Sequence, residues 1–575
     1  MSSRDDTGPG SSDPEKPGPD TSSTAKQPSI IDGLQPQKES PDQTSPHDIA
    51  QRDDDEKQYP SGLSLALILT SCFLCMFLTS LACRPLDRLI ITTAIPQITE
   101  EFKSVTDIAW YGAAYLLTQC ASQLLFGKIY SLFNIKATFL LSLLLFEVGS
   151  AVCGAAPSSI VFIVGRAIAG LGGAGMLCGV IAIFVHTIPL HKRPLYQGMF
   201  GAVFGVSSVT GPLLGGAFTS KVTWRWCFYI NLPLGGVAAV VIFWILKLPA
   251  RDTTKLDTKT KLKQLDFYGT ALIIPATVSL ILALQWGGSI YTWNDKRIIV
   301  LFVMAGLLFS GFILVQIFLP KTATIPPRIF KQRSIIAGFF STICMGSQLT
   351  IFAYYLPIWF QAIQAVSAVE SGVRLLPLVL SMVVAMLSAG ALVRHIGYYT
   401  PVMIFGVCLM SIGAGLMYTL QVDASSPQWI GYQIVYGLGA GSATQAPNIA
   451  AQTVLPKRDV PVGVSLMYFG NFVSSAIFLS VAQNIFNNQL LHRLSPIAGI
   501  DPESILDNGV TSLTKLSTSV RMPVLVAYNE AIRHIFLLAL VLVCLAMLGA
   551  LSLEWRSTKK SHEEDADDET TGKQA

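Results

Sequence analysis

Fourteen apolar runs, each about 18 to 25 residues long and so able to cross a bilayer as a helix, recur along the sequence. Only 13% of the residues are charged, whereas a soluble domain carries about 25%. The sequence therefore predicts an all-α polytopic membrane protein with 14 transmembrane helices. The expected spans are residues 63–83, 108–126, 137–156, 159–187, 196–219, 226–247, 268–286, 298–318, 335–355, 372–394, 400–420, 428–452, 462–486 and 533–554.

The distribution of lysine and arginine predicts that both termini are cytoplasmic. In that orientation the short inner loops hold about 17 of these residues and the short outer loops about 7, as the positive-inside rule requires. Residues 1–58 are rich in Ser, Pro, Asp and Gln, which predicts a disordered cytoplasmic tail. Residues 556–575 are expected to form a cytoplasmic C-terminal tail, and residues 487–532 an outer loop.

Glycines recur between two halves of the chain at a nearly constant offset. Gly127, Gly170, Gly198 and Gly205 have counterparts 263 to 267 residues later, at Gly390, Gly437, Gly463 and Gly470. Parallel repeats of this kind build many secondary transporters, in which the substrate lies near the midplane between the repeats. We expect six-helix halves at residues 59–247 and 321–555, separated by a cytoplasmic linker and an inserted helix pair at residues 248–320.

Small residues recur every three or four positions between residues 198 and 216, which places them on one face of a helix. The candidates for a conformational role are Gly201, Gly205, Gly211, Pro212, Gly215 and Gly216. In lipid such a stripe lets two helix backbones approach closely. The stripe is either a seam that slides during transport or only a tight helix–helix contact.

Three ionisable residues fall in or beside the apolar runs of the first half: Asp87, Glu147 and Arg166. Each costs about 2.5–3.5 kcal/mol at a helix centre, so each is expected to face a cavity or a partner. Asp87 and Arg166 are candidates for a proton-coupling pair, because an arginine keeps a neighbouring carboxylate charged until a proton displaces it. The alternatives are a bridge from Asp87 to Arg84 or Arg88 at the interface, and a structural hydrogen bond for Glu147.

Polar uncharged and aromatic side chains stand in several apolar runs, mainly in the second half. The substrate-cavity candidates are Gln119, Gln348, Tyr354, Gln361, Gln445, Asn448, Gln452 and Asn471. Such groups suit a bulky, mostly apolar ligand held by a few hydrogen bonds. The alternative role is to hydrogen-bond neighbouring helices to each other.

The remaining motifs predict neither an enzyme nor a cofactor. The ten cysteines lie in or beside apolar runs, without the spacing of a metal site or a disulfide framework. Residues 170–175 match G-x-G-x-x-G, but they lie within a helical run, whereas a dinucleotide site needs a preceding strand. We expect no catalytic residue, cofactor or metal. We also expect no nucleic-acid partner, because the net charge of +4 is too small and too dispersed to indicate binding to nucleic acid.

With these motifs, the chain resembles the major facilitator superfamily over about residues 60–555, and within it the fourteen-helix drug:proton antiporters that include fungal efflux pumps for toxins and secondary metabolites. GKIYSLFNIK at 127–136 is similar to the superfamily's cytoplasmic-loop motif and contains Gly127, Lys128 and Lys136, with Ser131 where Asp is usual. GRAIAGLGGAG at 165–175 resembles the motif whose arginine, here Arg166, is linked to proton coupling. GPLLGG at 211–216 resembles the antiporter motif, and WRWCFYINLPLGG at 224–236 is similar to a fourteen-helix signature.

The resemblance implies proton-coupled export of an amphipathic organic compound, such as a toxin, secondary metabolite or drug, by alternating access. It implies a small-molecule substrate, protons and the lipid bilayer as partners, a monomer as the functional unit, and the plasma membrane, with the vacuolar membrane as the alternative location. The main competing interpretation is an importer on the same fold, for siderophore-bound iron or, in the vacuole, for basic amino acids.

Overall fold

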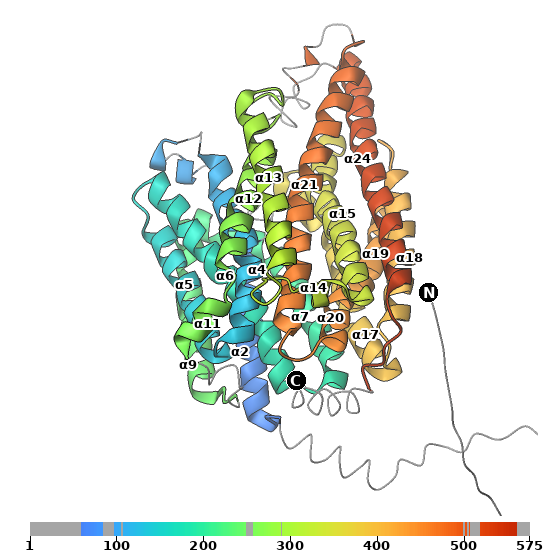
Figure 1. Cartoon of the computed structure of the whole chain (residues 1–575). Coiled ribbons are helices and arrows are strands. Elements are labelled where there is room, and N and C mark those ends of the chain that lie inside the picture. Colours follow the sequence, from blue (N-terminus) through green and yellow to red (C-terminus); the bar gives the residue numbers. More distant parts are fainter. Residues whose placement is uncertain are drawn as a thin grey trace, which may run out of the picture. The chain divides into compact units, whose positions relative to one another are not determined.

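The structure, a computed structural model, describes residues 59–83, 97–99, 101–104, 107–248, 257–288, 290–497, 501, 502, 505 and 518–559. The predictions made for residues 1–58 and for Asp87 lie outside these residues. Residues 56–575 form one compact unit, and within it the long helices run side by side (Figure 1). No strand of a sheet is present in the part of the chain that the structure describes.

The first half consists of helices whose bounds follow the expected apolar runs. They are α2 (Gly62–Cys83), α4 (Ile108–Leu132), α5 (Ile135–Ala155), α6 (Ser159–Thr187), a 3-10 turn η1 (Leu190–Lys192), α7 (Arg193–Lys221), α8 (Trp226–Tyr229) and α9 (Asn231–Ile245). The middle of the chain forms α11 (Thr258–Gln264), α12 (Phe267–Trp286), α13 (Lys296–Phe318) and α14 (Pro327–Phe330). The second half consists of α15 (Arg333–Ile363), α16 (Ala368–Val373), α17 (Leu376–Ile396), α18 (Thr400–Tyr418), α19 (Ser426–Ala443), α20 (Ala446–Val454), α21 (Val460–Leu494) and α24 (Thr518–Ser552).

Eleven helical segments in the described ranges are long and apolar enough to cross a membrane. The other three expected spans coincide with α4, α7 and α19, which are helical but richer in glycine and polar residues. The all-helical polytopic architecture is therefore confirmed, and the count of 14 spans stays a prediction.

The expected outer loop at 487–532 is shorter than the sequence indicated. Helices α21 and α24 each contain 35 residues, or about 52 Å at 1.5 Å per residue, whereas the hydrocarbon core is about 30 Å thick. Hydropathy falls beyond Phe486, but no proline or glycine interrupts the chain before Pro496. The helix consequently continues past the end of its apolar run.

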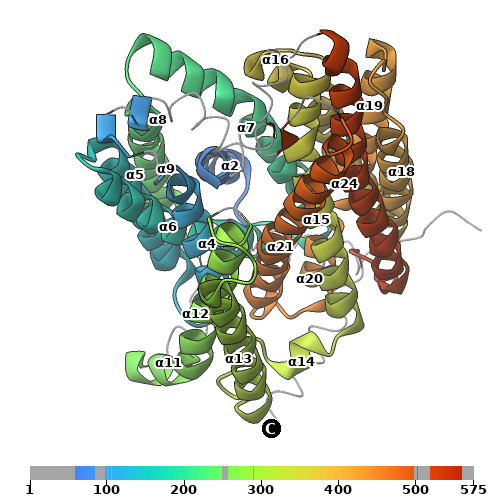
Figure 2. The same cartoon turned by 90° about the horizontal axis from the view of Figure 1, so that it is seen from above.

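Two large buried hydrophobic clusters divide the unit, and a third, smaller one surrounds Phe162 and Trp224. Of the two large clusters, one gathers buried side chains between residues 68 and 335 together with residues 451–469, and the other gathers those between residues 337 and 553. The first part of α21 therefore packs with the first half of the chain, although it belongs to the second. Seen from above, α12 and α13 lie beside α4 and α21 (Figure 2).

The two halves meet along two seams, one between α4 and α21 and one between α7 and α17. At the first seam a Cβ on Gly127 would lie 2.7 Å from the Ser465 Cβ and 3.0 Å from the Pro461 carbonyl oxygen. At the second, a Cβ on Gly390 would lie 2.5 Å from the Pro194 carbonyl oxygen. Real Cβ contacts are not this short, so both positions need glycine for the helices to approach this closely.

Candidate functional site

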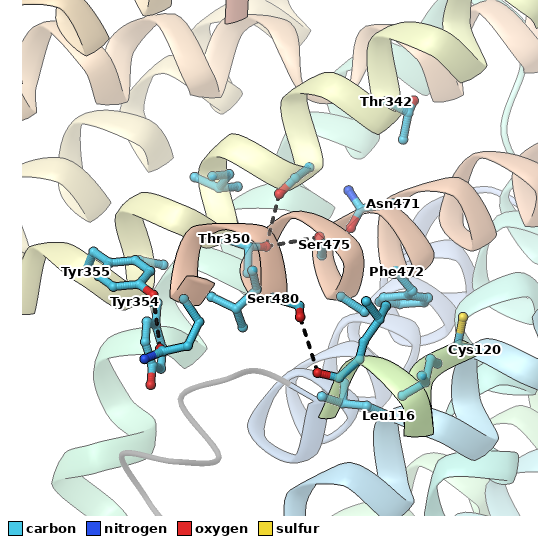
Figure 3. Close-up of a pocket in the computed structure, with 18 of the residues that line it drawn as sticks. Leu116, Cys120, Thr342, Thr350, Tyr354, Tyr355, Asn471, Phe472, Ser475 and Ser480 are labelled. Atoms are coloured by element: carbon cyan, nitrogen blue, oxygen red, sulfur yellow. Dashed lines mark hydrogen bonds between the residues drawn. The ribbon is translucent and has the colours of Figure 1, made fainter. Parts of the chain in front are cut away.

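A cavity of about 910 Å³ lies between the two halves (Figure 3). Its lining comes from both halves and from α12. It extends along α21 from Met467 to Asn487, and it includes Gln445 near one end and Tyr528 of α24 near the other. The volume lies within the range of 300–1,000 Å³ that is usual for small-molecule sites.

The lining differs between the two halves. Within the described residues, the first half contributes mainly apolar and aromatic groups, namely Leu116, Cys120, Leu177, Phe200 and Phe204. The second half contributes most of the hydroxyl and amide groups, namely Thr342, Thr350, Tyr354, Tyr355, Thr444, Gln445, Asn448, Tyr468, Asn471, Ser475, Ser480, Gln483, Asn484, Asn487 and Tyr528. No Asp, Glu, Lys, Arg or His is among the described lining residues, so this lining suits an apolar ligand with a few hydrogen-bonding groups.

Hydrogen bonds between α15, α21 and neighbouring side chains order the polar wall. The Thr350 hydroxyl donates to Ser475 Oγ at 3.0 Å (Figure 3), and the Tyr355 hydroxyl donates to Gln483 Oε1 at 3.1 Å. Gln483 Nε2 in turn donates to Asn487 Oδ1 at 2.9 Å. The wall is thus preorganised before a ligand binds, which limits the entropy that binding must offset.

At the end of the cavity where α21 begins, four amide side chains connect the two halves. Gln197 of α7 donates to Gln445 Oε1 at 3.3 Å and accepts from Gln452 Nε2 at 3.4 Å, and Asn448 Nδ2 also donates to Gln445 Oε1, at 3.3 Å. Gln197 is fully buried. The Asn448 Oδ1 and Gln452 Oε1 atoms are buried with no hydrogen-bond partner in the described structure. We call these four residues the amide cluster.

Four of the eight polar residues singled out from the sequence line the cavity: Tyr354, Gln445, Asn448 and Asn471. The other four lie elsewhere. Gln452 belongs to the amide cluster and Gln119 is buried in α4. Gln348 accepts from the Tyr436 hydroxyl inside the second half, and Gln361 donates to Ser371 Oγ at 3.1 Å. Gln348 and Gln361 therefore fit the alternative reading, in which such groups link neighbouring helices.

The sequence analysis missed polar lining residues of α21. Ser475, Ser480, Gln483, Asn484 and Asn487 all line the cavity, on the same helix as Asn471. Ser480, Gln483, Asn484 and Asn487 follow the i, i+3, i+4, i+7 spacing that marks one helix face. The signal was present, but two of these residues stand next to the predicted end of the span at residue 486 and one beyond it.

Arg166 lies at the contact between α6 and α4. Its side chain is 2% exposed, its Nε donates to the Tyr111 carbonyl oxygen at 2.8 Å, and its guanidinium lies 4.7 Å from the ring centre of Tyr115. Arg166 does not line the cavity. Its predicted partner Asp87 lies outside the described residues, so the pair stays a prediction.

Glu147 lies on a different interface, between α5 and α9. Its carboxylate packs against Gly235, where a Cβ would lie 2.6 Å from the Glu147 carboxyl carbon. Both carboxyl oxygens are buried without a hydrogen-bond partner in the described part of the chain. The neighbouring Asn231 donates instead to Ser150 Oγ at 3.0 Å. The structure thus separates Glu147 and Arg166 onto two interfaces of the first half.

The glycine stripe divides into two parts. A Cβ on Gly198 or Gly201 would meet Met386, and one on Gly205 would meet Val383, so these three glycines face α17. Farther along α7, Gly211 and Gly215 are buried, whereas a Cβ on Gly216 would have no neighbour within 4 Å. The structure does not describe the side chain of Pro212. The close contact thus involves the first part of the stripe.

The cytoplasmic-loop motif binds backbone carbonyls. Lys128 is 8% exposed, and its Nζ donates to the Ala323 carbonyl oxygen at 2.8 Å. Lys136 Nζ donates to the Phe243 carbonyl oxygen at 2.6 Å. Ser131, which stands at the motif's usual acidic position, donates to the Lys128 carbonyl oxygen within its own helix. At this end of α21, Asp459 pairs with Arg328 at 2.7 Å and more distantly with Arg458 at 3.7 Å.

The Trp-Arg signature holds the opposite end of the first half together. Arg225 donates to the carbonyl oxygens of Gly154 and Ala156 and, at 2.6 Å, to Glu101 Oε1, while Trp224 Nε1 donates to Glu101 Oε2 at 2.8 Å. Burial alone would raise the pKa of Glu101. The hydrogen bonds from Trp224 and Arg225 and the charge of Arg225 outweigh that effect and hold this pKa below its usual range. The signature therefore supports the fold at a distance from the cavity.

Comparison with known proteins agrees with this architecture. Residues 72–479 match the family model described as Major Facilitator Superfamily. An MFS-type transporter of Claviceps purpurea is 51% identical over 504 residues, which cover 87% of this chain and 86% of that protein. The MFS-type efflux pump MFS1 of Trichophyton rubrum is 47% identical over 502 residues, covering 87% and 93%. The rubrofusarin-specific efflux pump aurT of Gibberella zeae is 45% identical over 507 residues, covering 88% and 92%.

Solved structures share the fold at low identity. The human organic anion transporter MFSD10 has a TM-score of 0.54 at 14% identity, over 84% of this chain and 100% of that one. The proton:xylose symporter XylE has a TM-score of 0.52 at 12% identity, over 86% and 98%. The repeated halves, the cavity between them and the matching family model lead to one conclusion: this chain is a multi-pass membrane protein that belongs to the major facilitator superfamily.

Proposed function

We propose that this chain exports an amphipathic organic compound, of the toxin or secondary-metabolite kind, in exchange for protons. The observation that carries the proposal is the cavity of about 910 Å³ between the halves, apolar on the first-half side and lined by hydroxyl and amide groups on the other. A ligand with one apolar and one hydrogen-bonding face would match both walls. Relatives at 45–47% identity named as efflux pumps support the direction of transport.

Transport would follow alternating access. Near the end of the cavity where α21 begins, the Gly127 and Gly390 contacts and the amide cluster hold the halves together. The cavity extends from there toward the opposite end. If both termini are cytoplasmic, the closed end faces the cytoplasm and this state is open toward the outside. Rocking of the halves about these seams would then expose the cavity to the inside.

Proton coupling is assigned to the first half, on Glu147, Arg166 and Asp87. The two buried oxygens of Glu147 have no partner to stabilise a negative charge in the described structure, and burying an unpaired charge is costly. Glu147 is therefore suited to bind a proton in this state and to release it when α5 and α9 move apart. Arg166 would hold the opposing charge at the α4–α6 contact.

Location and assembly complete the proposal. We assign the chain to the plasma membrane as a monomer with both termini cytoplasmic, and the vacuolar membrane is the alternative. An importer of a basic amino acid would need carboxylates to bind its charge, and the described lining has none. This lining therefore speaks against import of a basic amino acid, whereas an importer of siderophore-bound iron stays the alternative that the transport assay distinguishes.

Because the 45% identical pump aurT is named as specific for rubrofusarin, we propose this compound as a first cargo. Its accumulation in a yeast strain that lacks its own efflux pumps tests the function. Cells that make this chain should hold less rubrofusarin than control cells, and a protonophore should abolish the difference. Arg166→Ala should reach the membrane in normal amount and yet fail to lower rubrofusarin accumulation. The reason is that the variant lacks the buried guanidinium group that contacts α4. Higher accumulation than in control cells would indicate import and would contradict the proposal.

A further inference from the structure

The α12–α13 pair contacts one helix of each half (Figure 2). Helix α12 packs on α4 of the first half and on α21 of the second. Helix α13 packs mainly on α12 and exposes many apolar side chains, such as Leu307, which is 69% exposed. The pair therefore has a sheltered helix beside the α4–α21 seam and an outer helix suited to contact lipid.

The end of α12 is attached to both seam helices. Ser480 Oγ of α21 donates to the Leu284 carbonyl oxygen at 3.2 Å, and Trp293 Nε1 donates to Asn484 Oδ1 of α21 at 2.7 Å. On the other side, the rings of Trp286 and Trp110 of α4 meet edge to face with centres 5.9 Å apart. Ser480 and Asn484 both line the cavity. The attachment thus brings α12 to the cavity itself.

Six residues of this segment line the cavity: Ile281, Leu284, Gln285, Gly287, Gly288 and Ile290. The turn after α12 is held in place by backbone hydrogen bonds, from Ile290 N and Tyr291 N to the Trp286 carbonyl oxygen at 2.9 and 3.0 Å. Gly288 has a φ of +75°, and a Cβ there would lie 2.7 Å from Trp293 Nε1. A residue with a side chain would be strained at that φ and would displace the indole. The segment is therefore a fixed surface rather than a loose connection.

We propose that this segment, residues 281–288 with Ile290, is a third wall of the substrate cavity and determines which cargo fits. Its aliphatic side chains would pack on the aromatic, uncharged part of the ligand, and Gln285 would offer one amide group beside it. The inference rests on the proposed function, since it assigns specificity to the same cavity. It adds that a helix pair outside the two six-helix halves contributes to the binding site.

Photolabelling of the full-length protein in lipid nanodiscs tests the wall. The probe is 4-hydroxybenzophenone, an uncharged aromatic phenol, and mass spectrometry maps the peptides that it labels in a saturable way. We expect saturable labelling both in residues 281–290 and in α21. Leu284→Trp should reduce the labelling of α21 at least about fivefold, because the larger ring would occupy the space between this wall and α21. The matched change Leu307→Trp, on the exposed face of α13, should keep it within about twofold.

The outcomes separate the wall from the transport function. Two results would overturn the proposal that this segment is a cavity wall. One is saturable labelling of α15 and α21 with none in residues 281–290, and the other is unchanged labelling of α21 in Leu284→Trp. Rubrofusarin export is measured with the same variants. If the wild type does not export but the labelling follows the expected pattern, the proposed function fails and the wall stands. If Leu284→Trp is poorly folded, a second variant, Ile290→Ala, only removes side-chain volume. It should still change the labelling in residues 281–290. An unchanged labelling pattern would count against the proposed wall.

Discussion

The two seams between the halves are related by the sequence repeat, yet they are built differently. Gly127 and Gly390 are repeat counterparts, and each contacts the start of the other half's seam helix. On α7, Gly198, Gly201 and Gly205 also face the opposite half, at Met386 and Val383. The counterparts of Gly198 and Gly205 on α21, Gly463 and Gly470, face Leu455 and Phe339, which belong to the same half as α21.

The α4–α21 seam has instead the α12–α13 pair beside it. Homologous glycines therefore do not imply homologous contacts. The difference indicates that the two seams have different roles. At the α7–α17 seam the helix backbones contact each other closely and must slide. The α4–α21 seam is covered by another helix pair and lies next to the cavity's polar wall.

The largest effect is expected from Gly198→Ala. Its Cβ would meet the Met386 carbonyl oxygen and lie 3.5 Å from Gly390 Cα. Because these are backbone atoms, no side chain can yield, and export should fall about tenfold or more while membrane insertion persists. The control is Gly216→Ala, where the added Cβ has open space. Equal export by both variants would show that export does not depend on the close backbone contact at the α7–α17 seam.

Gly127→Ala tests the other seam and should cost less. The nearest obstacle to its Cβ is the side chain of Ser465. We expect export to fall about threefold to tenfold, and Ser465→Gly in the same chain should restore part of it. Truncating Met386 to alanine should not rescue Gly198→Ala, because the obstacle there is a carbonyl oxygen. Rescue at both seams, or at neither, would contradict the proposed difference between them.

Gln197→Val addresses the amide cluster, which only the α7 side possesses, since the repeat counterpart of Gln197 is Val462. The change removes two long hydrogen bonds to Gln445 and Gln452, each worth about 0.5–1.5 kcal/mol. Together the two bonds amount to about 1–3 kcal/mol, so the equilibrium should shift toward the state open at this end by about fivefold to 150-fold. Accessibility of a cysteine placed at Thr444, which lines the cavity outside the cluster, to a thiol reagent added at this end of the protein would report this shift. Unchanged accessibility would show that the cluster does not hold the halves together.

The smallest effect is expected from Arg328→Gln at the α4–α21 side. Arg328 is 57% exposed and pairs with the buried Asp459 at the start of α21. Arg458 Nε also lies 3.7 Å from Asp459 Oδ1, so the buried carboxylate keeps a cationic neighbour in the variant. The loss should therefore be close to that of an exposed pair, about 0–1 kcal/mol and screened by salt, and export should change less than about fivefold. The difference from the wild type should shrink as ionic strength rises. A loss as large as that of Gly198→Ala would mean that charge pairing, rather than helix contact, controls closure.

Much of this architecture could be predicted from local patterns. The apolar runs gave the helix positions, and the glycine repeat placed Gly127 and Gly390 at corresponding points. What could not be predicted depends on three-dimensional contact. Gly205 and Gly470 are equivalent in the sequence, but only the packing shows that one faces the opposite half and the other its own.

The candidate site was predictable only in part, for the same reason. A glutamine in an apolar run has the same local signature whether it faces a cavity, as Gln445 does, or a tyrosine in the core, as Gln348 does. The contribution of α12 to the cavity was not foreseen at all. Its lining residues Ile281 and Leu284 are aliphatic and look like any other part of a lipid-buried helix.

The central claim, export of an organic compound in exchange for protons, is tested most directly in proteoliposomes. The purified chain is reconstituted with an acidic interior, and uptake of rubrofusarin is followed after dilution into alkaline buffer. The account predicts that rubrofusarin accumulates inside as protons leave, and that a protonophore or Gly198→Ala abolishes the accumulation. Accumulation only with the opposite pH gradient, so that the compound moves with the protons, would contradict the account.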